Sequence, residues 1–335
     1  MVDDRHMMFD NRKAAILSAV VQQYIETAQP VGSRRISDAP GVAVSPATVR
    51  HDMAVLEEQG YLAQPHTSAG RVPTDKGYRF FVDTLRQREP SLVVADRGMV
   101  RQFFADAHGE LESVLARTSD LLSSLTDCAA VVVGPNADVA RVRSTQLVDL
   151  STHVVMVVAV MSNGVIEKRT IEVATELTPQ IVHDANRRLA ETVVGKSLLE
   201  MTPEPRDDDP LLNAAVEALR AAARTAEIVV GGVSRVAAAF EAVEQIRDVL
   251  AILEQQIVVV SLIRDVLDRG MRVAIGGETG VETLADCSLV VAPYSVEGET
   301  TGMIGVLGPT RMDYEQALSA VAVVSRRLGH ALSEN

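Results

Sequence analysis

The sequence predicts an α+β fold built on aliphatic cores. Hydrophobic residues make up 47% of the 335 residues, whereas aromatic residues make up only 3%. Apolar residues recur with helical spacing from Asp10 to Gly60 and again from Val93 to Leu125. Val-rich runs between Ala129 and Val173, and strand patterns again from Met271 to Val306, indicate sheets. Helices and strands are therefore expected in separate blocks, within two or three domains.

The charge is unevenly distributed along the chain. The formal net charge is -13, but residues 1–89 carry 11 basic and 11 acidic side chains. The acidic excess thus lies entirely after Glu89, and a neutral N-terminal region with clustered arginines is still able to bind phosphate. Two cysteines, Cys128 and Cys287, are too few for a disulfide framework and favour a reducing compartment, the cytoplasm. No signal peptide and no membrane-spanning run is expected.

Two helices are predicted at the start of the chain. Asp10 is a good N-cap for a first helix that ends near Ala28, before the segment Gln29–Gly32. Ser33 is expected to cap a short second helix, Arg34–Ala39, which Pro40 and Gly41 interrupt. Short turns between helices of this length are typical of a helix-turn-helix.

The segment Val44–Gly60 predicts the second helix of a DNA-reading helix-turn-helix. Ser45 is the expected N-cap, Pro46 suits the first helical position, and Gly60 supplies a left-handed stop. An apolar stripe recurs at i, i+4 and i+7, and polar side chains fall largely elsewhere on the helix. Such helices touch bases and phosphates near their N-terminal ends.

A β-hairpin is predicted directly after this helix. Its strands are Tyr61–Gln64 and Arg71–Thr74, and its tip is small and polar. A hairpin in this place is typical of a wing that lies on a phosphate backbone or in a minor groove. The next helix, Asp75–Arg88, is expected to pack on the first three and lead out of them.

These elements predict one set of DNA contacts. Residues Ser45–Met53 would enter the major groove, with Arg50 and His51 nearest the bases and Thr48 facing either a base or a phosphate. The remaining members come from the second helix, the wing and the start of the fourth helix. The full set is Arg34, Arg35, Ser45, Thr48, Arg50, His51, His66, Thr67, Ser68, Arg71 and Lys76.

The run SPATVRHDMAVLEEQGYLAQPHTSAGRVPTDKGYRFFVD resembles the winged-helix region of the HrcA family of heat-inducible transcription repressors. The part QPHTSAGRVPTDKGYR is the most specific. In the family pattern an Asn commonly follows the Arg of the recognition helix, and here that position is His51. An amide pairs bidentately with adenine and an imidazole does not, so the base preference at this position is in doubt.

After a linker at Glu89–Ser91, the remainder predicts one more α+β domain. The four Val-rich runs Ala129–Val133, Gln146–Leu150, Val154–Val160 and Val165–Val173 are expected to form one antiparallel sheet. A helix over Thr178–Leu199 follows, with Thr178 as its cap. The break Met201–Pro210 contains three aspartates, which are favoured as a solvated turn over a metal site.

A helical block interrupts this domain in the prediction. Helices are expected over Leu211–Ala226, Ala237–Leu253 and Gln256–Asp268, followed by strands Met271–Ile275, Ser288–Ala292 and Met303–Val306, and a last helix over Met312–Leu332. The predicted domains are therefore a winged helix at 1–89, a discontinuous α+β domain at 90–200 and 270–335, and an insert at 201–269. The HrcA resemblance covers essentially the whole chain. It implies that the α+β domain is GAF-like and that the insert is a mainly helical dimerisation domain.

Enzyme classes are disfavoured. The segment Gly276–Gly280 lacks the Lys-Ser/Thr ending of a P-loop and is favoured as a turn. His153, His183 and His330 are isolated in sequence, and both cysteines adjoin strand-like runs where buried thiols are usual. Arg311 is favoured as a structural residue over an anion anchor. No catalytic, cofactor or metal site is therefore expected.

The resulting hypothesis is a dimeric, sequence-specific transcription repressor that binds an inverted repeat. The resemblance implies that the operator is the CIRCE inverted repeat of chaperone operons and that the GroEL chaperonin modulates activity. The first alternative is a metabolite-responsive winged-helix regulator whose GAF-like domain senses a small ligand. The second alternative is a catalytic domain tethered to a DNA-binding region. Such a domain requires a cluster of polar residues in a pocket, and the sequence contains no trace of one.

Overall fold

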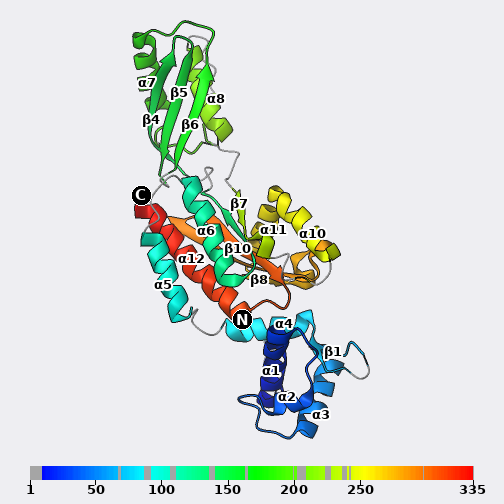
Figure 1. Ribbon diagram of the computed structural model, residues 1–335. Coiled ribbons are helices and arrows are strands. Elements are labelled where there is room, and N and C mark those ends of the chain that lie inside the picture. Colours follow the sequence, from blue (N-terminus) through cyan, green and yellow to red (C-terminus); the bar gives the residue numbers. More distant parts are fainter. Residues whose placement is uncertain are drawn as a thin grey trace.

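The computed structural model describes residues 10–66, 69–86, 92–105, 111–135, 140–162, 165–198, 200–201, 209–222, 228–235, 240, 243–296 and 298–334. They form an elongated molecule of three parts, which follow one another from the bottom to the top of Figure 1. Residues 10–86, called the head below, lie at one end. A five-stranded sheet lies in the middle, and a three-stranded sheet lies at the other end. The predicted α+β class is confirmed.

The head contains four helices and a two-stranded hairpin. Their bounds are α1 (Asn11–Thr27), α2 (Ser33–Ser37), α3 (Pro46–Glu58), β1 (Leu62–Ala63), β2 (Val72–Pro73) and α4 (Asp75–Leu85). Helices α1 and α3 contribute Ile16, Leu17, Val49 and Leu56 to a shared core in which all four side chains are fully buried. The order of elements in the head is as predicted, although both strands are shorter.

Local capping explains where the head's helices begin. The Asp10 carboxylate accepts a hydrogen bond from the Arg12 N–H at 3.3 Å, and the Ser45 hydroxyl accepts one from the Thr48 N–H at 3.3 Å, as predicted. The prediction that Ser33 caps the second helix is wrong. Gly32 holds the extended cap conformation, so the helix begins one residue early and Ser33 is its first residue.

The central sheet has the strand order β7-β3-β10-β9-β8, and every neighbouring pair is antiparallel. Its strands are β3 (Ala129–Val133), β7 (Ile228–Gly231), β8 (Val273–Ile275), β9 (Cys287–Val296) and β10 (Glu299–Pro309). Because side chains alternate across a strand, Ala130 and Val132 of β3 face one core while Val131 and Val133 face another. Both faces are therefore covered.

Helices cover the two faces in separate groups (Figure 1). The helices are α5 (Val94–Ala105), α6 (Leu111–Thr126), α12 (Tyr314–Glu334), α10 (Val243–Glu254) and α11 (Gln256–Asp268). They lie within the predicted helical segments or within two residues of them, but α10 begins later than the predicted start at Ala237, and Phe240 is not helical. The first three share a core with one sheet face and with the head, and the last two share a core with the other face. The predicted linker Glu89–Ser91 lies outside the described residues.

A second, separate sheet stands at the far end of the molecule. Strands β4 (Val142–Ser151), β5 (Val154–Met161) and β6 (Ile166–Glu172) form an antiparallel meander, and α7 (Pro179–Val193) and α8 (Pro210–Ala222) cover one of its faces. The prediction of one sheet from all four Val-rich runs is therefore wrong. Each run has strand character, but apolar content alone does not determine which strands pair.

The strand β7 (Ile228–Gly231) was not predicted. It lies within the block read as helical and pairs with β3, in register from Ala130 opposite Gly231 to Val133 opposite Ile228. Thus the three-stranded sheet, and not the helical block, leaves and rejoins the central sheet. The predicted insert at 201–269 does not have a single core of its own. Helix α8 packs in the core of the three-stranded sheet, whereas α10 and α11 pack on the central sheet.

Candidate nucleic-acid interface

Helix α3 lies at the end of the head away from the central sheet, beside α2 (Figure 1). Its stripe of Val49, Met53 and Leu56 is buried against the head's core, which fixes the rotation of the helix about its own axis. Arg50 and His51 are consequently exposed. Ser45 is also exposed, and its hydroxyl lies 3.0 Å from that of Thr48, so the two polar side chains at the start of α3 form a pair.

An ion pair that sequence reasoning missed holds α3 against α1. Arg12 donates through Nε to one oxygen of Asp52 at 2.7 Å and through Nη2 to the other at 3.3 Å. The Asp52 side chain is 1% exposed, so its charge is satisfied only by this bidentate contact among the described residues. The hydrogen bond to Asp52 raises the pKa of Arg12 above its ordinary value. The sequence did contain a signal for this pair, because Asp52 is a charged residue directly beside Met53 of the apolar stripe.

Helix α2 adds two cations to the same end of the head. Arg34 and Arg35 are both exposed, and α2 packs against α3. Arg34, Arg35, Arg50 and His51 therefore lie on two adjacent helices, and this part of the head could hold phosphate oxygens while one helix reaches base edges.

The hairpin is fixed to the head at its base. Backbone hydrogen bonds join Val31 and Arg71 in both directions, each at 2.9 Å. The Arg71 Nε lies 2.8 Å from a carboxylate oxygen of Glu57, and the Arg71 side chain is only 19% exposed. This ionic contact lacks hydrogen-bond geometry, since the Nε–H has no hydrogen-bond acceptor in the described structure. Arg71 thus ties the hairpin to α3. His66 is exposed near the tip, and Thr67 and Ser68 lie outside the described residues.

Lys76 lies at the opposite end of α3 from Ser45. Its Nζ donates to the carbonyl of Gln59 at 2.8 Å, and it lies 4.3 Å from the centre of the Tyr61 ring. Thirteen residues of α3 separate the two ends, which corresponds to about 20 Å at about 1.5 Å per residue. Lys76 therefore satisfies the last turn of α3 and is remote from the exposed cations at its start.

The features considered for other chemistries have structural partners. The segment Gly276–Thr279 is a 3-10 turn, η2, as the turn interpretation predicted. Asp209 accepts from Arg188 at 2.9 Å and from the Leu212 N–H at 3.1 Å, so it caps α8 instead of lying in a solvated turn. Asp207 and Asp208 are outside the described residues. Burial raises the pKa of the Cys128 and Cys287 thiols to about 12, which keeps both unreactive.

The described residues lack both a metal-ligand cluster and a membrane-spanning helix. They contain no group of three or more His, Cys, Asp or Glu side chains that could hold a metal ion. None of their helices is long and apolar enough to cross a membrane.

The comparisons with known proteins agree on one family. The model of the HrcA protein C-terminal domain matches residues 112–318. The heat-inducible transcription repressor HrcA of Thermobifida fusca is 38% identical, with 99% of each chain covered. That of Pelotomaculum thermopropionicum is 37% identical, with 97% of each covered. A crystal structure described only as that of a hypothetical protein matches with a TM-score of 0.70 at 23% identity, over 97% of this chain and 99% of the other, and so shares the fold.

Proposed function

Since the chain belongs to the HrcA family of heat-inducible transcription repressors, we propose that it represses transcription by placing α3 in the major groove of an inverted-repeat operator. The observation that carries this proposal is the exposed, cationic start of a capped helix at the far end of the head. Three helices followed by a hairpin correspond to a winged helix-turn-helix, so the hairpin is its wing. The chain is accordingly a regulator and not an enzyme.

The geometry supports different roles for the candidate residues. Arg50 and His51 are assigned to base edges, and Thr48 and Ser45 to the phosphates beside the start of α3. Arg34 and Arg35 supply phosphate contacts from α2. From the wing, the sequence assigns His66, Thr67 and Ser68 to the DNA backbone, and the last two lie outside the described residues. Arg71 and Lys76 act indirectly, because the first holds the wing and the second ends α3.

We divide the chain into a winged helix at 10–86, a GAF-like domain at 92–135 and 228–334, and an inserted unit at 140–222. The division follows the two sheets and their cores. It places α10 and α11 in the GAF-like domain, and it makes the inserted unit a sheet covered by α7 and α8. An inverted-repeat operator requires a two-fold symmetric dimer, so one of these parts must carry a self-complementary surface.

The outer face of the β4–β6 sheet is the best candidate for that surface. Met156, Val158 and Val160 of β5 point away from α7 and α8. Met156 lies opposite Val148 of β4, and Val160 lies opposite Ile166 of β6. Ile166 is 54% exposed and Val148 is 37% exposed. An aliphatic strip of this kind on a sheet face is typical of a dimer interface.

Changing Ile166→Asp is expected to shift the protein from dimer to monomer, because a carboxylate would be buried against its own symmetry mate. The mass in solution, measured by light scattering, checks this. Ile181→Asp is the matched control. Ile181 is 41% exposed in the first turn of α7, which covers the other sheet face, and an acid there is compatible with the helix start. A dimer that survives Ile166→Asp would locate the interface elsewhere.

The family resemblance extends the proposal to the operator and its control. The CIRCE inverted repeat is the proposed target, and the GroEL chaperonin is the proposed partner that raises the active fraction of repressor. The mean hydropathy of +0.12 is compatible with a chain that needs folding assistance.

A salt-titrated binding assay on a CIRCE duplex and a scrambled duplex, with and without chaperonin, tests the proposal. We expect strong preference for the repeat, raised by chaperonin, and a steep loss of affinity with salt on both duplexes. Equal weak binding to both duplexes would contradict sequence-specific repression. Preference for the repeat that appears only when a small molecule is added would instead support the metabolite-responsive regulator.

A further inference from the structure

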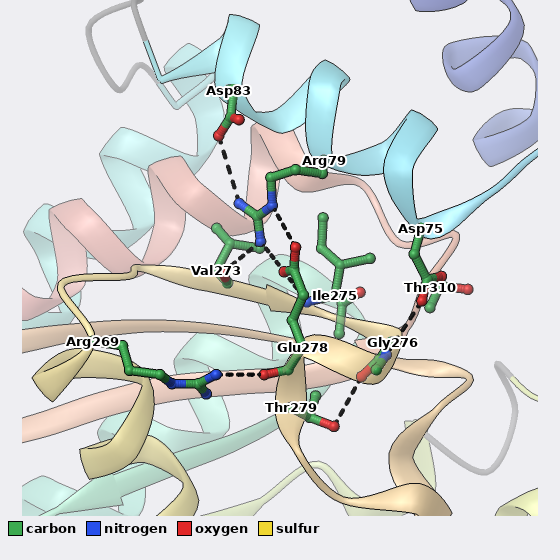
Figure 2. Close-up of polar contacts among 12 residues, drawn as sticks. Asp75, Arg79, Asp83, Arg269, Val273, Ile275, Gly276, Glu278, Thr279 and Thr310 are labelled. Atoms are coloured by element: carbon green, nitrogen blue, oxygen red, sulfur yellow. Dashed lines mark hydrogen bonds and ion pairs between the residues drawn. The ribbon is translucent and has the colours of Figure 1, made fainter. Parts of the chain in front are cut away.

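The head is attached to the central domain by a cluster of polar contacts around Arg79, shown in Figure 2. The Arg79 guanidinium, on α4, donates to both carboxylate oxygens of Glu278, through Nε at 2.9 Å and through Nη2. The same Nη2 donates to the carbonyl of Val273 at 2.8 Å, and Nη1 lies 3.6 Å from Asp83. Every nitrogen of the Arg79 guanidinium therefore faces an acceptor inside the protein.

Glu278 is also held by hydrogen bonds within the central domain. Its Oε2 also accepts from the Ile275 N–H at 2.9 Å, and its carbonyl accepts from Arg269 Nη1 at 2.9 Å. Burial lowers the pKa of Arg79, but the hydrogen bond and the charge of Glu278 outweigh it, so the pKa ends above its ordinary value. Arg79 is therefore charged, and its bidentate contact fixes the two side chains in one geometry.

A second contact lies one helical turn away, at the start of α4. The Asp75 carboxylate accepts from the Gly277 N–H at 3.2 Å. Gly276 makes this approach possible, since it has a φ of +52° and a Cβ built on it would lie 2.2 Å from an Asp75 oxygen. The 3-10 turn η2 thus presents one backbone N–H and one carboxylate to two consecutive turns of α4.

Apolar packing completes the attachment. The rings of Tyr78 on α4 and Tyr314 on α12 have their centres 5.8 Å apart, and both side chains are buried. The head's buried residues form one continuous cluster with those under α5, α6 and α12. Apolar contacts are non-directional, whereas a bidentate ion pair allows one orientation. The polar contacts are therefore what select the angle at which the head stands.

We propose that the contacts of Arg79 and Asp75 with η2, called the joint below, set which half-site spacing of the operator the repressor accepts. The inference rests on the proposed function, because it requires two heads on one inverted repeat. Helix α4 packs on α1, which in turn holds α3 through Arg12 and Asp52. The orientation of α3 relative to the central domain is therefore transmitted from the joint, and Arg79 is a positioning residue without contact to DNA.

Spacing selection follows from rigidity. When both heads are fixed, the second half-site is bound at a high effective concentration only if its distance and its rotation about the DNA axis match. Inserting about 5 base pairs rotates one half-site by about half a turn, which a rigid dimer does not accommodate. A loosened joint would let the heads reorient, so the discrimination would shrink while binding by a single head would not change.

The test uses variants on the domain side of the joint, so that the sequence of the head is intact. Glu278→Ala removes the ion pair, and Gly276→Ala obstructs Asp75 without removing a charge. Glu282→Ala is the matched control for the first, as an exposed carboxylate in the next turn. Gly277→Ala is the control for the second, because a Cβ there meets nothing within 4 Å and the N–H is kept. Each full-length protein is titrated with the repeat, the repeat lengthened by about 5 base pairs, and a single half-site.

We expect the wild type and both controls to prefer the natural spacing by at least about tenfold. Glu278→Ala and Gly276→Ala are expected to bring that ratio below about threefold with single half-site affinity unchanged. A ratio unchanged in both variants would overturn the inference, and so would a wild type that binds both spacings equally. A wild type that prefers neither the repeat nor the half-site to scrambled DNA would contradict the proposed function as well, which separates the two failures.

Discussion

Changing Arg50→Ala is expected to weaken operator binding by about 1–3 kcal/mol, or roughly 5- to 150-fold, while affinity for scrambled DNA falls much less. Arg50 is exposed on the first turns of α3, and a planar guanidinium in that place is suited to the two acceptors of a guanine. Loss of a base contact costs affinity only where that base is present. The measurement is the ratio of dissociation constants for the CIRCE duplex and the scrambled duplex at two salt concentrations.

Two comparisons make this prediction specific. Arg34→Ala, on α2, is expected to weaken binding to both duplexes equally and to reduce the salt dependence by about one counterion. Arg187→Ala removes the same charge from α7, where the side chain is 63% exposed, and should leave both affinities unchanged. If Arg50→Ala behaves like Arg34→Ala, then Arg50 contacts a phosphate, and another residue of α3 reads the bases of the operator.

The change Gly70→Ala is expected to detach the wing. A Cβ at Gly70 would lie 2.4 Å from the carbonyl oxygen of Val31, and this contact is with backbone, which cannot rotate away. The chain must therefore shift at the point where Val31 and Arg71 exchange hydrogen bonds, and the Arg71–Glu57 pair would shift with it. Overpacking of this kind costs about 1–3 kcal/mol. We expect a lower melting temperature and a loss of affinity on every DNA duplex.

Gly32→Ala provides the control for that substitution. Gly32 lies in the same turn as Val31, but a Cβ there would meet nothing within 4 Å. Because Ala is a poorer N-cap than Gly, this change should cost up to about 1 kcal/mol, without moving the backbone at Val31. Equal melting temperatures and equal DNA affinities for Gly70→Ala and the wild type would contradict the attachment of the wing at Val31.

Local signals predicted most of the head correctly. Asp10, Ser45 and Gly60 act within a few residues of themselves, so the beginnings of α1 and α3 and the end of α3 could be read from neighbouring side chains. The start of α2 failed by one residue because Gly32 and Ser33 are both competent caps. Exposure of Arg50 and His51 followed from the apolar stripe of the same helix.

Pairing between distant segments could not be read in this way. Arg71, Lys76 and Arg79 all look like surface cations in sequence, yet their partners are Glu57, Gln59 and Glu278. Nothing in a run of residues tells which carboxylate will face a given arginine. The same reason explains why the prediction of one sheet from four Val-rich runs was wrong. Ala129–Val133 and the later runs share a composition but pair with different strands.

The pairing of β3 with β7 has a consequence for how the chain is built. Val133 and Ile228 lie opposite each other, so residues 134–227 leave the central sheet and return to it at adjacent positions. Topologically, β3 and β7 are a hairpin whose connection contains a sheet and a hydrophobic core of its own. The entropic cost of closing a loop grows only with the logarithm of its length, so an inserted segment of this size adds little to the cost of closing the hairpin. The site is therefore a natural point for grafting or excision, at which the sheet would be closed again by a short turn.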